Sequence, residues 1–116
     1  MNDDNLINRV LLGDVREACK KIPDLFIQSI VTSPPYYGHR KYSKDQDLAT
    51  EIGREVNLSE YLHNIVGSFS LLKQKLKNNG LLWLNLGDTY RNKSLLGVPW
   101  KVAFAMQDDG WILRSD

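Results

Sequence analysis

Short apolar runs alternate with segments of helical periodicity along the chain, and this alternation limits the possible folds more than any other feature. Four runs rich in β-branched and leucine residues are predicted strands, at residues 9–12, 27–32, 81–86 and 111–113. Strands that alternate with helices are typical of α/β proteins, because each connecting helix returns the chain to start a parallel strand. The sequence therefore predicts an α/β fold with a mostly parallel sheet.

Three segments between these runs carry helix signals. The first follows Asp14, whose side chain can cap a helix start. The second shows one apolar face over residues 58–76 and is expected to end before Gly80. The third has Pro99 in its first turn and Gly110 just after its end, which is the usual asymmetry of these two residue types. Trp83, Trp100 and Trp111 are expected in the core.

Polar or special residues follow three of the predicted strands. They are Gly13-Asp14, Ser33 to Tyr36, and Gly87-Asp88. In open parallel sheets ligands bind at the carboxyl ends of strands, so the three clusters indicate a site. Turn chemistry alone also explains the two Gly-Asp pairs. Asp88 is interpreted as a turn residue in preference to a catalytic residue. For Asp14, a helix cap and a ligand contact are both open and compatible.

The segment Ser33-Pro34-Pro35-Tyr36 is the most informative of these clusters. Ser33 and Pro34 each precede a proline, which pushes both toward extended backbone angles. Proline has no N–H, so Pro34 offers only a carbonyl acceptor, beside the Ser33 hydroxyl. A stiff loop that aims two acceptors suits the exocyclic amino group of a base, whose lone pair must be freed from the ring before it can attack. Tyr36 can stack on a base turned out of the duplex, a contact worth about 1–3 kcal/mol.

The Ser-Pro-Pro-Tyr segment resembles the catalytic motif of DNA amino-methyltransferases. Collinear likeness to the same family continues through residues 32–42, 82–90, 97–103 and 110–114. It resembles the circularly permuted group, in which the catalytic motif precedes the cofactor loop. The resemblance implies a Rossmann-like sheet that uses S-adenosylmethionine, and double-stranded DNA as partner. A leading serine is the form commonly associated with N4-cytosine methylation, and a leading aspartate with N6-adenine methylation.

The resemblance also implies roles for single residues. Ser33 and Pro34 would hydrogen-bond the target amino group, within the catalytic segment that includes Pro35, and Tyr36 would stack on the base. Asp14 corresponds by position to an acidic residue near the cofactor adenine or the target base. Nothing in the sequence pairs His39 with His63 into a metal site. Arg40, Lys41 and Lys44 follow the motif and are either phosphate contacts or part of a solvated loop.

The family's cofactor loop, Phe-x-Gly-x-Gly, has no counterpart here, because the chain contains no Gly-x-Gly. Residues 1–116 are therefore expected to be the N-terminal, catalytic-motif portion of the domain, with an incomplete sheet and without the target-recognition region. In the family's sheet the strand at 9–12 is separated from 27–32 by two strands from the missing part. We expect such a chain to be inactive alone, and to be unstable, to self-associate, to pack its strands differently or to need a complementing C-terminal half.

Three other functions stay open at this point. Related Asn-Pro-Pro-Tyr enzymes methylate protein glutamine, and the chain could also be a non-catalytic remnant. Residues 34–37 match the Pro-Pro-x-Tyr ligand of WW domains as well.

The net charge of +1 is not the strongly basic charge that usually indicates a nucleic-acid-binding surface. One cysteine, Cys19, and the lack of a signal peptide or membrane-length apolar run predict a cytoplasmic protein. The resemblance implies a prokaryotic, nucleoid-associated one.

Overall fold

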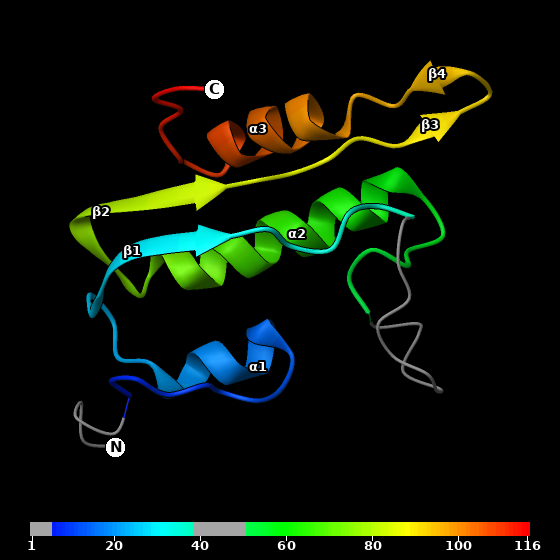
Figure 1. Ribbon diagram of the computed structural model, residues 1–116. Helices are drawn as coiled ribbons and strands as arrows, with labels where there is room; N and C mark the ends of the chain where they lie inside the picture. The colour runs from blue at the N-terminus through cyan, green and yellow to red at the C-terminus, as the bar shows by residue number, and fades with distance from the viewer. Residues whose placement is uncertain (1–5, 39–50) are drawn as a thin grey trace. The chain divides into compact units, whose positions relative to one another are not determined.

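The computed structural model describes residues 6–38 and 51–116, drawn in colour in Figure 1. The chain divides into two compact units. The first comprises Met1–Val31 and Ser68–Trp83, and the second comprises Thr32–Gly67 and Leu84–Asp116. The predicted α/β class is confirmed at the level of a small mixed structure with one parallel pair of strands.

The first unit is built on two neighbouring strands, β1 (Ile27–Thr32) and β2 (Leu76–Leu84), which pair in one sheet. Their arrows run in the same direction in Figure 1, as parallel strands do. A short helix α1 (Val15–Ala18) and a 3-10 turn, η2 (Cys19–Lys21), precede them. Burial in this unit gathers on Cys19, Ser68, Phe69 and Leu76. The strand predicted at residues 27–32 is confirmed at both ends.

The long helix α2 (Leu58–Lys73) contributes to both units. Asn57 caps its start, because the Asn57 Oδ1 accepts a 2.9 Å hydrogen bond from the Glu60 N–H. The helix ends seven residues before Gly80, so the prediction that Gly80 follows the helix end is wrong. Gly80 lies inside β2, where an added Cβ would lie 2.9 Å from Leu76 Cδ2 and from the Lys77 carbonyl oxygen, and 3.1 Å from the Gln28 carbonyl oxygen. Close approach of two backbones therefore explains this glycine.

The second unit contains the hairpin β3 (Tyr90–Arg91) and β4 (Ser94–Leu95), followed by helix α3 (Val98–Asp108). Pro99 lies in the first turn of α3 and Gly110 follows its end with φ +99°, as predicted. The Gly110 and Trp111 N–H groups donate to the Gln107 and Met106 carbonyls, which closes the helix end. The buried apolar residues of this unit are Tyr37, Ile52, Tyr61, Ile65, Val98, Val102 and Met106.

Two predicted strands do not form, and both predictions are wrong. Residues 9–12 and 111–113 are irregular. Val10 and Leu12 are each 94% exposed, and Ile112 is 81% exposed. A strand requires neighbours that satisfy its backbone groups, and neither run has a ladder partner among the residues that the structure describes.

The sheet of the first unit presents an uncovered apolar face. Val31 is 79% exposed, Leu81 52% and Trp83 60%. Parallel strands are almost always covered on both faces, so this surface is unusual for a finished domain. Trp100 in the second unit is 61% exposed as well, so the core placement predicted for Trp83 and Trp100 is wrong. Among the described helices, none is long and apolar enough to cross a membrane.

Candidate active site at the Ser-Pro-Pro-Tyr loop

The motif loop, residues 33–36, begins directly after β1, at the carboxyl end of the strand as predicted. Ser33 is exposed, and its Oγ lies 3.2 Å from the Tyr36 hydroxyl oxygen. The Pro34 carbonyl oxygen accepts no hydrogen bond within residues 6–38 and 51–116. Two acceptors, one from a side chain and one from the backbone, are thus presented by consecutive residues of a stiff loop.

Tyr61, on α2, fixes the middle of the motif loop. Its hydroxyl donates a 2.8 Å hydrogen bond to the Pro35 carbonyl oxygen, and the side chain is fully buried. Burial, together with the nearby negative charge of Glu55, raises the pKa of Tyr61 far above its ordinary value, so the hydroxyl keeps its proton and remains a donor. A buried side chain of α2 therefore holds the backbone of the motif loop in place.

The Tyr36 ring lies against Gly87. A Cβ added at Gly87 would lie 2.5 Å from Tyr36 Cε2 and 2.8 Å from Cδ2, closer than any real contact. The Asn85 amide nitrogen lies 3.5 Å from the Tyr36 hydroxyl oxygen. Only glycine at position 87 leaves room for the ring, so the Gly87-Asp88 turn sets the position of Tyr36 as well as its own geometry.

Tyr37, the next residue, anchors the loop in the core. It is 2% exposed, and its ring centroid lies 5.5 Å from that of Tyr61. The Thr89 hydroxyl donates a 2.6 Å hydrogen bond to the Tyr37 carbonyl oxygen. Burial of the ring and the hydrogen bond to its carbonyl therefore give Tyr37 a packing role.

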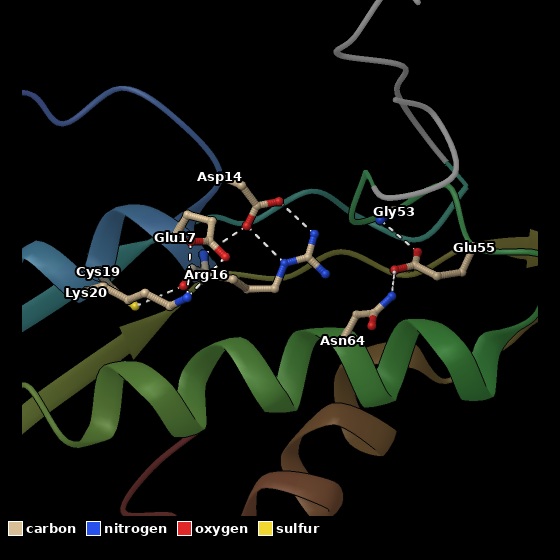
Figure 2. A network of polar contacts seen from close by, with 8 residues as sticks. All are labelled: Asp14, Arg16, Glu17, Cys19, Lys20, Gly53, Glu55 and Asn64. Carbon is tan, nitrogen blue, oxygen red and sulfur yellow. Dashed lines mark hydrogen bonds and ion pairs between the residues drawn. The ribbon is translucent and has the colours of Figure 1, made fainter. Parts of the chain in front are cut away.

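Residues 51–56 support the motif loop from another side. The Gly38 N–H donates to the Gly53 carbonyl at 2.8 Å, and a Cβ at Gly53 would lie 3.0 Å from the Tyr36 carbonyl oxygen. Figure 2 shows how Glu55 holds this segment: one carboxylate oxygen accepts the Gly53 N–H and the other accepts the Asn64 amide, each at 2.8 Å. Asn64 lies on α2, three residues after Tyr61, so one helix supports the loop at two points.

Asp14 caps α1, as the sequence predicts. Its Oδ1 accepts the Arg16 N–H at 2.8 Å, and its carboxylate also forms a two-pronged pair with the Arg16 guanidinium at 2.9 and 2.6 Å (Figure 2). The side-chain hydrogen bond from Arg16 lowers the pKa of Asp14 below its ordinary value. Asp14 belongs to the first unit and the motif loop to the second, and its role as a ligand contact stays a prediction.

Asp88 acts on the start of α3. Its carboxylate accepts the Thr89 N–H at 2.8 Å and the Gly97 and Val98 N–H groups at 3.0 Å each. Desolvation alone would raise the pKa of Asp88, but these three backbone donors together outweigh it and lower the pKa. The carboxylate thus replaces the missing side chain of the Gly97 cap, which agrees with the interpretation of Asp88 as a turn residue.

Sequence reasoning missed the residues that support the loop. Tyr61 was taken only as part of an apolar helix face, and Gly53 and Gly87 were not assigned a contact. A tyrosine at a buried helix position was a usable signal, because its hydroxyl needs a partner once it is buried. The close approaches at the two glycines depend on tertiary structure and carry no local signal.

Some sequence predictions concern residues that the structure does not describe. His39, Arg40, Lys41 and Lys44 lie outside the described residues. Within the part of the chain that the structure describes, no three histidine, cysteine or acidic residues are grouped to hold a metal ion.

Comparison with known proteins identifies the family. Residues 27–116 match the family model described as DNA methylase, of the N6/N4 type. The chain is 34% identical to type II methyltransferase M.SmaI of Serratia marcescens, over 93% of this chain and 46% of that protein. It is 35% identical to type II methyltransferase M.XycI of Xanthomonas campestris pv. cyanopsidis, over 90% of this chain and 43% of that protein.

A third relative, type II methyltransferase M.MwoI of Methanothermobacter wolfeii, is 38% identical over 90% of this chain and 16% of its own length. No solved structure matches the chain. The chain thus spans under half the length of these curated relatives, while nearly all of its own length is matched. With 90 of its residues inside the family match, the chain belongs to the N6/N4 DNA methylases.

Proposed function

We propose that this chain supplies the catalytic half-site of an enzyme that methylates the exocyclic amino group of a DNA base. The observation that carries the proposal is the motif loop at the end of β1, where the Ser33 hydroxyl oxygen lies 3.2 Å from the Tyr36 hydroxyl oxygen and the next residue, Pro34, offers a carbonyl acceptor. Family membership implies a Rossmann-like sheet, of which β1 and β2 form a part. The complete enzyme comprises this chain and the polypeptide, fused or separate, that supplies the cofactor loop.

The three residues divide the work of catalysis. Tyr36 stacks on the base turned out of the duplex and sets the plane of its ring. Ser33 and Pro34 accept the two amino hydrogens, which favours a pyramidal nitrogen with its lone pair directed away from the ring. Loop stiffness from Pro34 and Pro35, with Tyr61 beneath, holds these atoms in a reactive geometry before the base arrives.

S-adenosylmethionine is the proposed methyl donor, and its sulfonium group activates the methyl carbon for direct transfer. The residues of this chain fit part of its site. The Oδ1 atom of Asp14 already accepts two hydrogen bonds from Arg16, whereas Oδ2 accepts one and has capacity for a second, so Asp14 can hold a cofactor hydroxyl or amino group through Oδ2. The remaining cofactor contacts are assigned to the glycine loop of the complete enzyme.

We assign cytosine N4 as the target, with adenine N6 as the alternative. A serine hydroxyl at position 33 is a neutral acceptor that can also donate, so it can serve an amino group and the adjacent ring nitrogen of cytosine. The complete enzyme would act on double-stranded DNA in a prokaryotic cytoplasm.

The exposed apolar face of β1 and β2 is the surface on which we expect the complementing half of the domain to pack. The relatives extend well beyond the matched part, and the exposed face of β1 and β2 carries Val31, Leu81 and Trp83. Burial of a large apolar side chain contributes about 1.5–3 kcal/mol, so covering this face would strongly stabilise the unit. We assign that role to the C-terminal half, with self-association of this chain as the fallback in its absence.

The structure weighs against a WW-domain ligand. Such ligands bind as extended, accessible segments. Here the Pro35 carbonyl is bonded to Tyr61, the Tyr36 ring lies against Gly87, and Tyr37 is buried. Binding would require residues 35–37 to leave their partners.

Ser33→Ala and Tyr36→Ala test the proposal in the complete enzyme. Ser33→Ala removes one acceptor, and loss of one such preorganised group is expected to lower kcat about 100-fold or more. Tyr36→Ala removes a stacking contact of about 1–3 kcal/mol, which corresponds to about a 5- to 150-fold loss of kcat/KM. Transfer of labelled methyl groups to DNA, followed by nucleoside analysis, measures both effects and identifies the base.

Ser59→Ala, an exposed serine at the start of α2, is the matched control and should retain full activity. Unchanged turnover in the Ser33 and Tyr36 variants would remove the motif loop from catalysis. Label found on protein glutamine in place of DNA would replace the proposal with the protein-methylating alternative.

A further inference from the structure

The β3–β4 hairpin is a short, two-faced element that emerges beside the motif loop. Tyr90 pairs with Leu95 and Arg91 pairs with Ser94, so Arg91 and Ser94 share one face. Asn92 and Lys93 form the turn, with φ +53° and +66°, which is the left-handed geometry of a tight hairpin. All six residues are exposed.

The Arg91 face is turned toward the motif loop. The Arg91 guanidinium lies 5.7 Å from the centre of the Tyr37 ring, in cation–π geometry. Thr89, immediately before the hairpin, donates to the Tyr37 carbonyl at 2.6 Å. The guanidinium therefore lies over the ring of the residue that follows Tyr36.

The hairpin is also locally cationic. Residues 90–95 contain Arg91 and Lys93 and no acidic residue. The nearest upstream carboxylate, Asp88, is already bonded to three backbone N–H groups. Among the residues that the structure describes, no ion pair joins Arg91 or Lys93 to a carboxylate. The exposed turn can therefore attract an anion with several acceptor oxygens, and guanidinium groups match phosphate geometry well.

We propose that the β3–β4 hairpin binds the DNA backbone next to the target base, with Arg91 and Lys93 contacting phosphate oxygens. The inference rests on the proposed function, since it takes Tyr36 as the base-stacking residue. A base that stacks on Tyr36 brings its flanking phosphates close to the adjacent residues, and Arg91 is held over the very next side chain. Contacts of this kind position the duplex without reading its sequence.

The test is the salt dependence of duplex binding by the complete enzyme, measured by fluorescence anisotropy with a random-sequence duplex. Each phosphate contact contributes about 0.9 to the slope of log K against log salt, so Arg91→Gln with Lys93→Gln should reduce the slope by about 1.8. Lys21→Gln with Lys77→Gln removes the same charge from exposed positions of the first unit and should leave the slope unchanged. Arg91→Lys with Lys93→Arg keeps both charges and should retain the slope.

Equal slope changes in the hairpin and control variants, or none in either, would overturn the inference. If the double variant melts early, Lys93→Gln alone, at the exposed turn, carries the test with half the slope change. Methyl transfer to DNA by the unaltered complete enzyme is measured in parallel. Its absence would refute the proposed function, whereas methyl transfer with an unchanged slope would refute the hairpin site alone.

Discussion

Gly87→Ala should lower methyl transfer by the complete enzyme about 100-fold while leaving the protein folded. The new Cβ would lie 2.5 Å from Tyr36 Cε2, so the half-buried ring must swing away from its position. A ring displaced by even an ångström no longer presents a parallel face to the base. The measurement is kcat for methyl transfer to DNA, with the thermal unfolding temperature as a check on folding.

Gly67→Ala is the control for this substitution. Gly67 lies inside α2, where an added Cβ meets nothing within 4 Å. That variant should keep full activity and gain about 1 kcal/mol of stability, because alanine is the better helix former. Full activity in Gly87→Ala would show that Tyr36 is not confined by Gly87, or that its position does not matter.

Tyr61 is expected to show the largest stability effect in the chain. Tyr61→Ala removes a fully buried ring from the core of the second unit, and such truncations cost about 3–5 kcal/mol in the free energy of unfolding. Tyr61→Phe keeps the ring but leaves the Pro35 carbonyl without its donor, at a cost of about 1–3 kcal/mol. Urea unfolding measures both values.

Tyr61→Phe also separates positioning from stability. The variant should lower kcat for methyl transfer while leaving the KM for the methyl donor unchanged, because only the aim of the motif loop is altered. Ser59→Ala removes a hydroxyl from an exposed position of the same helix and should change neither quantity. Wild-type kcat in a folded Tyr61→Phe enzyme would limit Tyr61 to a structural role.

The sequence predicted those elements whose signals are local. The strand at Ile27–Thr32 is continuous and bounded by turn residues, and α3 is bounded by Pro99 and Gly110, so both were found. The motif loop was found for the same reason, because two prolines restrict the backbone whatever surrounds it. Fold class and family could therefore be inferred before any coordinates.

The failures share a tertiary cause. Residues 9–12 and 111–113 have strand composition, but strand formation depends on neighbours that the described part of the chain does not supply. Gly80 was interpreted as a helix stop, whereas close contact with the Gln28 backbone explains it. The hairpin at residues 90–95 has only two residues in each strand and a turn without glycine, so it gave no signal.

The supports of the motif loop could not be predicted either, because they connect distant parts of the chain. Tyr61 reaches Pro35 across 26 positions, and Thr89 reaches Tyr37 across 52. Neither contact leaves a trace in local periodicity. The sequence supplied the motif residues that we propose face the base, and the structure adds the residues that hold the motif loop in place.

Photo-crosslinking tests the central claim most directly. A duplex that carries 5-iodocytosine at the target position is bound to the complete enzyme, irradiated and digested, and the crosslinked peptide is sequenced by mass spectrometry. Our account predicts a crosslink to Tyr36, lost in Tyr36→Ala and weakened in Gly87→Ala. A crosslink to a residue outside 33–37, in an enzyme that methylates that same base, would contradict it.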